Sequence, residues 1–262
     1  IIAGSGDDKV TTGNDNDIIF GDNASLTFNT QGQTVLLLST QLDFGGADSI
    51  TTGDGHNTVI AGFGSDEVTT GNGADDVIGD NGVIEYVNGS AVRLATNDSV
   101  VSTTGIDTII VGDGDNRVLA GLSNDEVTST NGVDVVLGDN GELTYVNNIL
   151  VKAVSSEATL GGVDTLDLGE GNNVVIAGQD SDVVNAGSGN DIVLGDNGEI
   201  NFDAAGVITD IQSTATDQGG DDRITLIDGN NIVIAGFGSD QVTTSNGADD
   251  VIGDNGVIEY VN

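Results

Sequence analysis

Aliphatic residues in this chain recur every nine positions against a background of glycine, aspartate and asparagine. Residues 52–60, 61–69 and 70–78 read TGDGHNTVI, AGFGSDEVT and TGNGADDVI, with Gly at position 4, Asp or Asn at position 6 and Val at position 8. The first six positions are typical of a glycine-rich turn, and the last three of a short strand with one inward aliphatic side chain. Each nonamer therefore predicts half of a coil, in which acidic side chains lie beside backbone carbonyl groups.

A longer period of about 58 residues contains these nonamers. The motif Val59-Ile60-Ala61-Gly62 has equivalents that begin at Ile1, Val118, Val175 and Val233. The expected repeat units are residues 1–58, 59–117, 118–174 and 175–232, followed by the first half of a fifth unit at 233–262. Residues 59–88 and 233–262 differ at only two positions, which indicates duplication within one array. Because both ends interrupt a unit, we expect the chain to be a window on a longer repetitive protein.

Each unit also contains an insertion in which apolar and polar residues alternate. After the turn Gly79-Asp80-Asn81-Gly82, residues 83–95 alternate about Asn88-Gly89, which is a strong β-hairpin signal. The related insertions span residues 25–38, 142–154 and 199–211. An aromatic residue lies at one offset from the G-D-N turn in every copy, where we expect it to cover the small aliphatic side chains of the coil: Phe28, Tyr86, Tyr145, Phe202 and Tyr260. The sequence therefore predicts an all-β solenoid interrupted by hairpins.

Position 6 supplies a regular series of oxygen-bearing side chains. Its occupants are Asp8, Asp17, Asp48, Asn57, Asp66, Asp75, Asp107, Asn116, Asp125, Asp134, Asp164, Asn173, Asp182, Asp191, Asp222, Asn231, Asp240 and Asp249. The G-D-N turns add Asp22, Asp80, Asp139, Asp196 and Asp254. We take all of these residues as candidate ligands of a hard cation, because such ions prefer oxygen ligands. Asn recurs in the second nonamer of every complete block, and a site with one Asn and one Asp carries less charge than one with two Asp. We therefore expect two affinity classes.

The nonamers resemble the hemolysin-type calcium-binding nonapeptide, known as RTX, whose pattern is G-G-x-G-x-D-x-U-x. The resemblance implies a right-handed parallel β-roll in which turns two apart in sequence stack on one another. It implies that Asp48 shares a calcium ion with Asp66, and Asn57 with Asp75. Backbone carbonyls of the turns, such as those of residues 45, 46 and 63, would complete shells of six to eight oxygens. Two to three ions per unit, on the order of ten per chain, are expected.

The chain departs from this family pattern in several ways, which include Ala or Thr in place of the first Gly and short blocks of about four nonamers. Asp15, Ser123 and Asp180 occupy the position-4 glycine slot, where the turn requires a positive φ. Asp tolerates that conformation better than Ser, so the turn at Ser123 is the weakest match. The hairpin insertions are also foreign to the pattern, and the resemblance covers nearly all of the chain outside them.

Composition supports a dependence on cations. The chain has 43 acidic and 5 basic residues, for a net charge of −38, so it would repel itself strongly without metal. It lacks the basic patches that nucleic acid or anionic membrane surfaces require, and no apolar run approaches the ~20 residues that span a bilayer. The absence of Cys excludes disulfide staples and suits an extracellular bacterial protein in calcium-rich surroundings.

Catalysis finds little support in the sequence. His56 is the single histidine and falls at position 5 of a turn, where we expect an exposed side chain. Counts alone leave a glycosidase-like pair of acids open, but every candidate acid already has a role in the repeat. We therefore expect no enzyme.

Three functional interpretations remain. The preferred one is a calcium-dependent structural array of a large extracellular bacterial protein, acting as a stalk, adhesin shaft or filament that folds on meeting Ca²⁺ outside the cell. The alternative is the calcium-binding and secretion region of a toxin or hydrolase exported by type I secretion. A ligand-binding module that uses the hairpins is the third. Neighbouring repeats are the expected protein partners, and head-to-tail association into filaments is physically available to the end strands.

Overall fold

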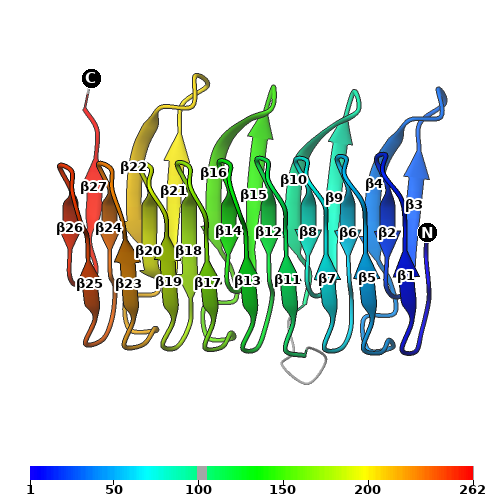
Figure 1. Cartoon of the computed structure of the whole chain (residues 1–262), viewed down its shortest axis with the longest axis horizontal. Helices are drawn as coiled ribbons and strands as arrows, with labels where there is room; N and C mark the ends of the chain where they lie inside the picture. The colour runs from blue at the N-terminus through cyan, green and yellow to red at the C-terminus, as the bar shows by residue number, and fades with distance from the viewer. Residues whose placement is uncertain (99–104, 262) are drawn as a thin grey trace.

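The computed structural model describes residues 1–98 and 105–261, so residues 99–104 of the expected second unit and residue 262 of the fifth lie outside the described residues. Within the described part, the chain forms strands and turns without a helix, and the strands make three nine-stranded sheets. The molecule is an elongated stack of coils with the two ends of the chain at opposite ends of its long axis (Figure 1). The expected all-β parallel solenoid with hairpin insertions is confirmed.

The first sheet, which we call the outer sheet, is parallel. Its strands are β1 (Lys9–Thr11), β5 (Ser49–Thr51), β7 (Glu67–Thr69), β11 (Thr108–Ile110), β13 (Glu126–Thr128), β17 (Thr165–Asp167), β19 (Val183–Ala186), β23 (Arg223–Leu226) and β25 (Gln241–Thr243). Val10 pairs with Ile50, and Ile50 pairs with Val68, so position 8 stacks on position 8 without a slip of register. Side chains at positions 7 and 9 face away from the roll and are exposed or partly exposed.

The second sheet, the middle sheet, is also parallel. Its strands are β2 (Ile18–Phe20), β6 (Thr58–Ile60), β8 (Asp76–Ile78), β12 (Arg117–Leu119), β14 (Val135–Leu137), β18 (Val174–Gly178), β20 (Ile192–Asp196), β24 (Ile232–Ile234) and β26 (Asp250–Ile252). Its position-8 residues, such as Val59 and Val77, meet those of the outer sheet in a continuous core of small aliphatic side chains. The two parallel sheets therefore form the β-roll.

The third sheet, the hairpin sheet, is antiparallel and contains the insertions. Its strands are β3 (Ala24–Phe28), β4 (Thr34–Ser39), β9 (Gly82–Val87), β10 (Ser90–Thr96), β15 (Gly141–Val146), β16 (Ile149–Ser155), β21 (Gly198–Phe202), β22 (Ile208–Ser213) and β27 (Val257–Glu259). Hairpins of successive units pair with one another, as Leu37 with Ile84 and Leu94 with Leu143. The insertions are therefore joined into one sheet along the whole roll.

The hairpin sheet packs on the middle sheet through a second apolar core. Phe20, Ile60 and Ile78 of the middle sheet contact a cluster that includes Leu37 and Ile84 of the hairpins, and all five side chains are buried. Because the middle sheet is covered on both faces, strands such as β14 (VVL) and β18 (VVIAG) are continuous apolar runs, whereas β8 and β12 begin with the paired charged residues Asp76 and Arg117. The molecule is thus a three-layered stack of outer, middle and hairpin sheets.

The expected aromatic covers are present in the interior hairpins only. Tyr145 is buried, and Tyr86 and Phe202 are partly buried against the second core. Phe28 and Tyr260, in the first and last copies, are 55% and 44% exposed. An aromatic residue at this offset is covered when hairpins lie on both sides of it, so its burial depends on neighbouring units rather than on its own.

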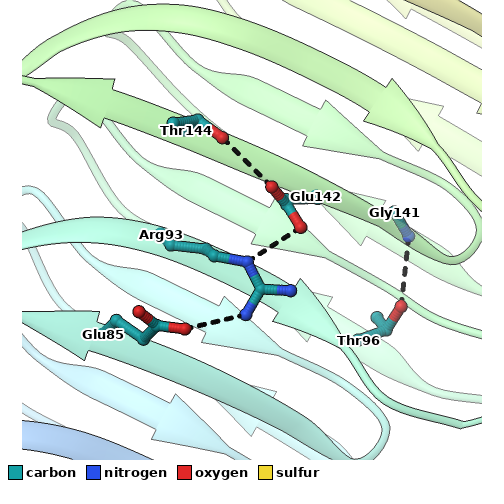
Figure 2. A network of polar contacts seen from close by, with 6 residues as sticks. All are labelled: Glu85, Arg93, Thr96, Gly141, Glu142 and Thr144. Carbon is teal, nitrogen blue, oxygen red and sulfur yellow. Dashed lines mark hydrogen bonds and ion pairs between the residues drawn. The ribbon is translucent and has the colours of Figure 1, made fainter.

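Polar side chains also join successive hairpins. Arg93 of β10 pairs with Glu85 of β9 at 3.1 Å and with Glu142 of β15 at 2.8 Å, and the Thr96 hydroxyl accepts a hydrogen bond from the Gly141 N–H (Figure 2). These groups lie on the partly exposed face of the sheet, where ion pairs contribute about 0–1 kcal/mol each. These contacts fix the register between hairpins and contribute little to the stability of the sheet.

Candidate metal centre

The position-6 side chains form two continuous ladders, one along each edge of the roll. The acidic ladder, before the strands of the outer sheet, contains Asp8, Asp48, Asp66, Asp107, Asp125, Asp164, Asp182, Asp222 and Asp240. The mixed ladder, before the strands of the middle sheet, contains Asp17, Asn57, Asp75, Asn116, Asp134, Asn173, Asp191, Asn231 and Asp249. All the position-6 residues that the sequence singles out therefore lie on one of two lines.

One hydrogen bond repeats along both ladders. The Oδ1 atom of each residue accepts the backbone N–H of the position-6 residue on the preceding rung, as from Asp48 to Asp66 at 2.7 Å and from Asn57 to Asp75 at 2.7 Å. The same bond joins Asp66 to Asp107 at 2.8 Å, across a hairpin insertion. Turns two apart in sequence therefore stack as expected, and the hairpins do not interrupt the ladders.

The second carboxylate oxygen in the acidic ladder has no partner. The Oδ2 atoms of this ladder that are buried without a hydrogen-bond donor belong to Asp48, Asp66, Asp107, Asp125, Asp164, Asp182, Asp222 and Asp240. Oδ2 of the mixed-ladder residues Asp75, Asp134 and Asp191 is also buried without a donor. An unpaired carboxylate oxygen in a dry site is costly unless an opposite charge approaches it. A row of such atoms beside turn carbonyls has the chemistry of a Ca²⁺ site, so the residues fit this ion.

Four of the five G-D-N aspartates join the acidic edge. Asp22 and Asp80 each accept a backbone N–H at 2.6 Å, from Phe63 and Leu122 respectively, through Oδ2. Their Oδ1 atoms are buried without a donor. Asp139 and Asp196 accept a backbone N–H on each oxygen, with Oδ1 accepting from Gly162 and Gly220 and Oδ2 accepting from Gln179 and Phe237. In the last turn, Asp254 is exposed.

The electrostatics of the acidic edge follow from burial and crowding. The pKa of Asp66 is raised from its ordinary 3.8 to about 8, first by burial and then by the charges of Asp48 and Asp22, against an opposing backbone hydrogen bond. Burial likewise raises the pKa of Asp222 to about 8. The pKa of Asp107 lies well above its usual range because of burial and of neighbouring carboxylates. Without cations, this edge therefore favours protonated carboxyl groups.

Backbone carbonyls are needed to complete any metal site here. Among residues 1–98 and 105–261, no three His, Cys, Asp or Glu side chains converge in a geometry that could hold a metal ion. Turn carbonyls would therefore be among the ligands of a cation on either edge. Calcium accepts such mixed shells.

The mixed ladder has a different local chemistry. The Oδ1 atom of Asn57 accepts the N–H of Asp17 at 3.2 Å, in the role of an aspartate Oδ1. Its Nδ2 donates to the carbonyls of Gly53 and Gly55 in its own turn, at 3.1 and 3.4 Å, and to Asp75 Oδ1 at 3.1 Å. The turn carbonyls at Asn57 therefore already have a donor.

The backbone of the three irregular turns follows the family geometry. Asp15, Ser123 and Asp180 have φ values of 136°, 92° and 69°, so the non-glycine residues at position 4 adopt the positive φ that the sequence predicts. Such residues carry local strain of order 1–3 kcal/mol. The stacking of neighbouring rungs offsets it.

Several residues that hold the turns of the metal centre in place are not apparent from the sequence. Asp98 is buried and accepts hydrogen bonds from the N–H and Nδ2 of Asn81, at 2.9 and 3.1 Å. The Asn of the G-D-N turn also reaches the loop that leaves the preceding hairpin, as Asn81 Nδ2 does to the Leu42 carbonyl at 3.2 Å. The invariance of this Asn among the five turns is the signal that could have indicated this role.

The groove between the middle sheet and the hairpin tips is a second concave feature. Its volume is about 1020 Å³, and its lining includes Arg117, Asp76 and Tyr145. Arg117 pairs with Asp76 and lies 4.7 Å from the centre of the Tyr145 ring. His56, at its rim, is exposed as expected, with Nδ1 3.2 Å from the Ala74 carbonyl. The charges of Arg117 and Asp76 therefore neutralise each other.

The fold and the two ladders define a calcium-binding β-roll of nonapeptide turns. The family model described as RTX calcium-binding nonapeptide repeat (4 copies) matches residues 1–24, 51–83, 95–127, 112–142, 159–198 and 227–257, more than half of the chain. The chain belongs to this family. RTX repeats bind Ca²⁺ and are typical of secreted bacterial proteins. No curated protein and no solved structure matches the chain. The described residues contain no helix long and apolar enough to cross a membrane.

Proposed function

We propose that this chain is a calcium-stabilised structural array of a large extracellular bacterial protein, serving as a stalk, adhesin shaft or filament. The observation that supports this role is the acidic ladder, which runs unbroken from Asp8 to Asp240 with eight buried, donor-free carboxylate oxygens. The modules of the array are residues 1–58, 59–117, 118–174, 175–232 and 233–262. Joined hairpins and continuous ladders favour a rod over separate domains.

The mechanism is folding gated by Ca²⁺. The Oδ1 atoms hold successive turns at the spacing of adjacent strands by accepting backbone N–H groups. The Oδ2 atoms, the G-D-N aspartates and the turn carbonyls are the proposed ligands. Calcium held by these groups would supply the positive charge that offsets the carboxylates. The chain is thus disordered where calcium is scarce and folds after export, where calcium is abundant.

The proposed stoichiometry is on the order of ten ions per chain. That number would offset about 20 of the 38 net negative charges, which removes much of the self-repulsion of the compact state. Native mass spectrometry counts the ions directly. Two ions or fewer would contradict the pairing of stacked turns.

Circular dichroism and small-angle scattering at neutral pH test the gating. With calcium we expect a β-rich spectrum and a radius of gyration of about 18 Å, and with excess EGTA a loss of β signal and a radius toward about 56 Å. Magnesium should substitute poorly, since it demands a tighter shell. A β-rich spectrum that excess EGTA leaves unchanged would contradict the proposal.

The alternative is the calcium-binding and secretion region of a type I secreted toxin or hydrolase. The period of about 58 residues and the continuous hairpin sheet favour the array, because an export signal needs neither. A catalytic domain in the same reading frame would favour the alternative. Sedimentation velocity in calcium tests whether chains also associate head to tail.

A further inference from the structure

The asparagines of the mixed ladder alternate strictly with its aspartates. Every second position is Asn, at 57, 116, 173 and 231, whereas the acidic ladder has Asp at all nine positions. The two edges share backbone register, strand spacing and the Oδ1 hydrogen bond. Any difference between them therefore arises from the second side-chain atom, which is an acceptor Oδ2 in Asp and a donor Nδ2 in Asn.

The orientation of each amide follows from its neighbour on the preceding rung. Asn116 Oδ1 accepts the N–H of Asp75 at 3.0 Å. A reversed amide would place two donors against each other, so Nδ2 must point into its own turn. There it donates to the carbonyls of Gly112 and Gly114 at 3.1 and 3.0 Å, and to Asp134 Oδ1 on the next rung at 3.0 Å.

The same contacts recur in other units. Asn173 Nδ2 donates to the carbonyls of Gly169 and Gly171 at 3.3 and 3.4 Å, and Asn231 Nδ2 donates to Asp249 Oδ1 at 3.1 Å. The partners are thus carbonyls of positions 2 and 4 and the aspartate of the following rung. Turn carbonyls and an aspartate oxygen are also the kinds of ligand that Ca²⁺ would use between two stacked turns.

The corresponding atom of the acidic ladder faces the opposite situation. Asp107 Oδ2 and Asp125 Oδ2 are buried with no donor, so each carboxyl group needs either a bound cation or a proton. An amide N–H₂ supplies two donors without any charge, which removes that requirement at the Asn rungs, whereas Oδ2 of the mixed-ladder residues Asp75, Asp134 and Asp191 is buried without a donor as on the acidic ladder.

We propose that the four mixed-ladder asparagines are built-in substitutes for calcium. The turn pair of each Asn and the Asp that follows it binds no ion, because the amide hydrogens occupy the donor role. This inference rests on the proposed calcium-dependent function. It also replaces the sequence expectation that Asn57 and Asp75 share an ion. The roll consequently has one edge that needs ions at every rung and one edge that the chain itself satisfies at alternate rungs.

Isosteric exchanges between the two edges test the proposal. Asn116→Asp converts an amide-filled turn into a copy of the acidic ladder, and native mass spectrometry in calcium should count one additional ion. Asp125→Asn makes the reverse change, and the count should fall by one. Asn147→Asp adds the same charge at a hairpin tip, where the residue has φ 52°, and should leave the count unchanged.

A second measurement tests the proposal even if a variant fails to fold. Anomalous scattering from crystals of the parent protein grown in calcium should show ions along the acidic ladder and none between Asn116 and Asp134. An ion at that place, or an unchanged ion count in folded Asn116→Asp, would overturn the inference and leave the proposed function intact. A parent protein that binds no calcium would overturn both.

Discussion

Protons should replace calcium in part, since both relieve the charge of the same buried carboxylates. Asp66 and Asp222 are each 2% exposed, and burial raises the pKa of both from 3.8 to about 8. A raised pKa in the folded state means that the ion-free roll binds protons more tightly than the unfolded chain does. Its stability is therefore greatest at low pH and falls as the pH rises from about 4 through about 8.

The magnitude follows from the size of the shift. Each pKa unit corresponds to about 1.4 kcal/mol, so keeping Asp66 ionised in the ion-free roll costs about 6 kcal/mol. Asp222 has a shift of the same size. These two residues together approach the whole stability of a typical domain, about 5–15 kcal/mol. Calcium-free protein should hence be largely unfolded at pH 8 and regain β structure near pH 5.

The assay is circular dichroism on protein stripped of calcium with a chelating resin, scanned from pH 4.5 to 8.5, with thermal melts at each pH. A parallel series in excess calcium should remain folded over the upper part of this range. Sodium chloride at matched ionic strength controls for screening. Equal or greater stability of the calcium-free protein at pH 8 than at pH 5 would refute the reasoning.

Three further predictions concern single positions. Asp66→Ala should lower the calcium count only in the adjacent turns, because each rung contacts its neighbours, and loss of calcium binding along the whole chain by calorimetric titration would contradict this. Gly79→Ala should destabilise the folded protein by about 3 kcal/mol, because its Cβ would lie 2.3 Å from a carbonyl oxygen and 2.4 Å from a ladder carboxylate oxygen. Gly13→Ala is the control, since Gly13 has open space around it, and it should cost under about 0.5 kcal/mol. Thermal melts in calcium measure both. Arg117→Met should lower the free energy of unfolding by about 3–5 kcal/mol, because it leaves the buried Asp76 carboxylate unpaired. Arg93→Ala on the hairpin sheet should lower it by no more than about 1 kcal/mol. Urea denaturation measures both changes. Equal effects of the two arginine changes would refute that comparison.

The stacking of turns along the roll could be predicted from the sequence. Val59 and Val77 share position 8 of successive same-side turns, and the period alone places one on the other. Asp48 and Asp66 meet for the same reason. In a strict repeat each turn contacts only the turns before and after it in the stack. The pattern of one unit therefore determines how all units stack.

Contacts between layers could not be predicted in this way. The pairing of Leu94 with Leu143 joins two hairpins of different units, and nothing in either hairpin specifies its neighbour. Arg117 meets Asp76 because the intervening hairpin leaves the roll and returns one rung later. The role of Asn116 was also hidden, since a residue type alone does not say whether its second atom faces a cation or two carbonyls.

The hydrogen bonds that join rungs in all three sheets run along the long axis of the molecule (Figure 1). A tensile load on the array would thus act on these bonds directly and peel one rung from the next. Release of one unit of about 58 residues would add about 190 Å of extended chain. Under load, an array of such units would lengthen in discrete steps and dissipate energy at each step. The calcium concentration would set the force at which each step occurs.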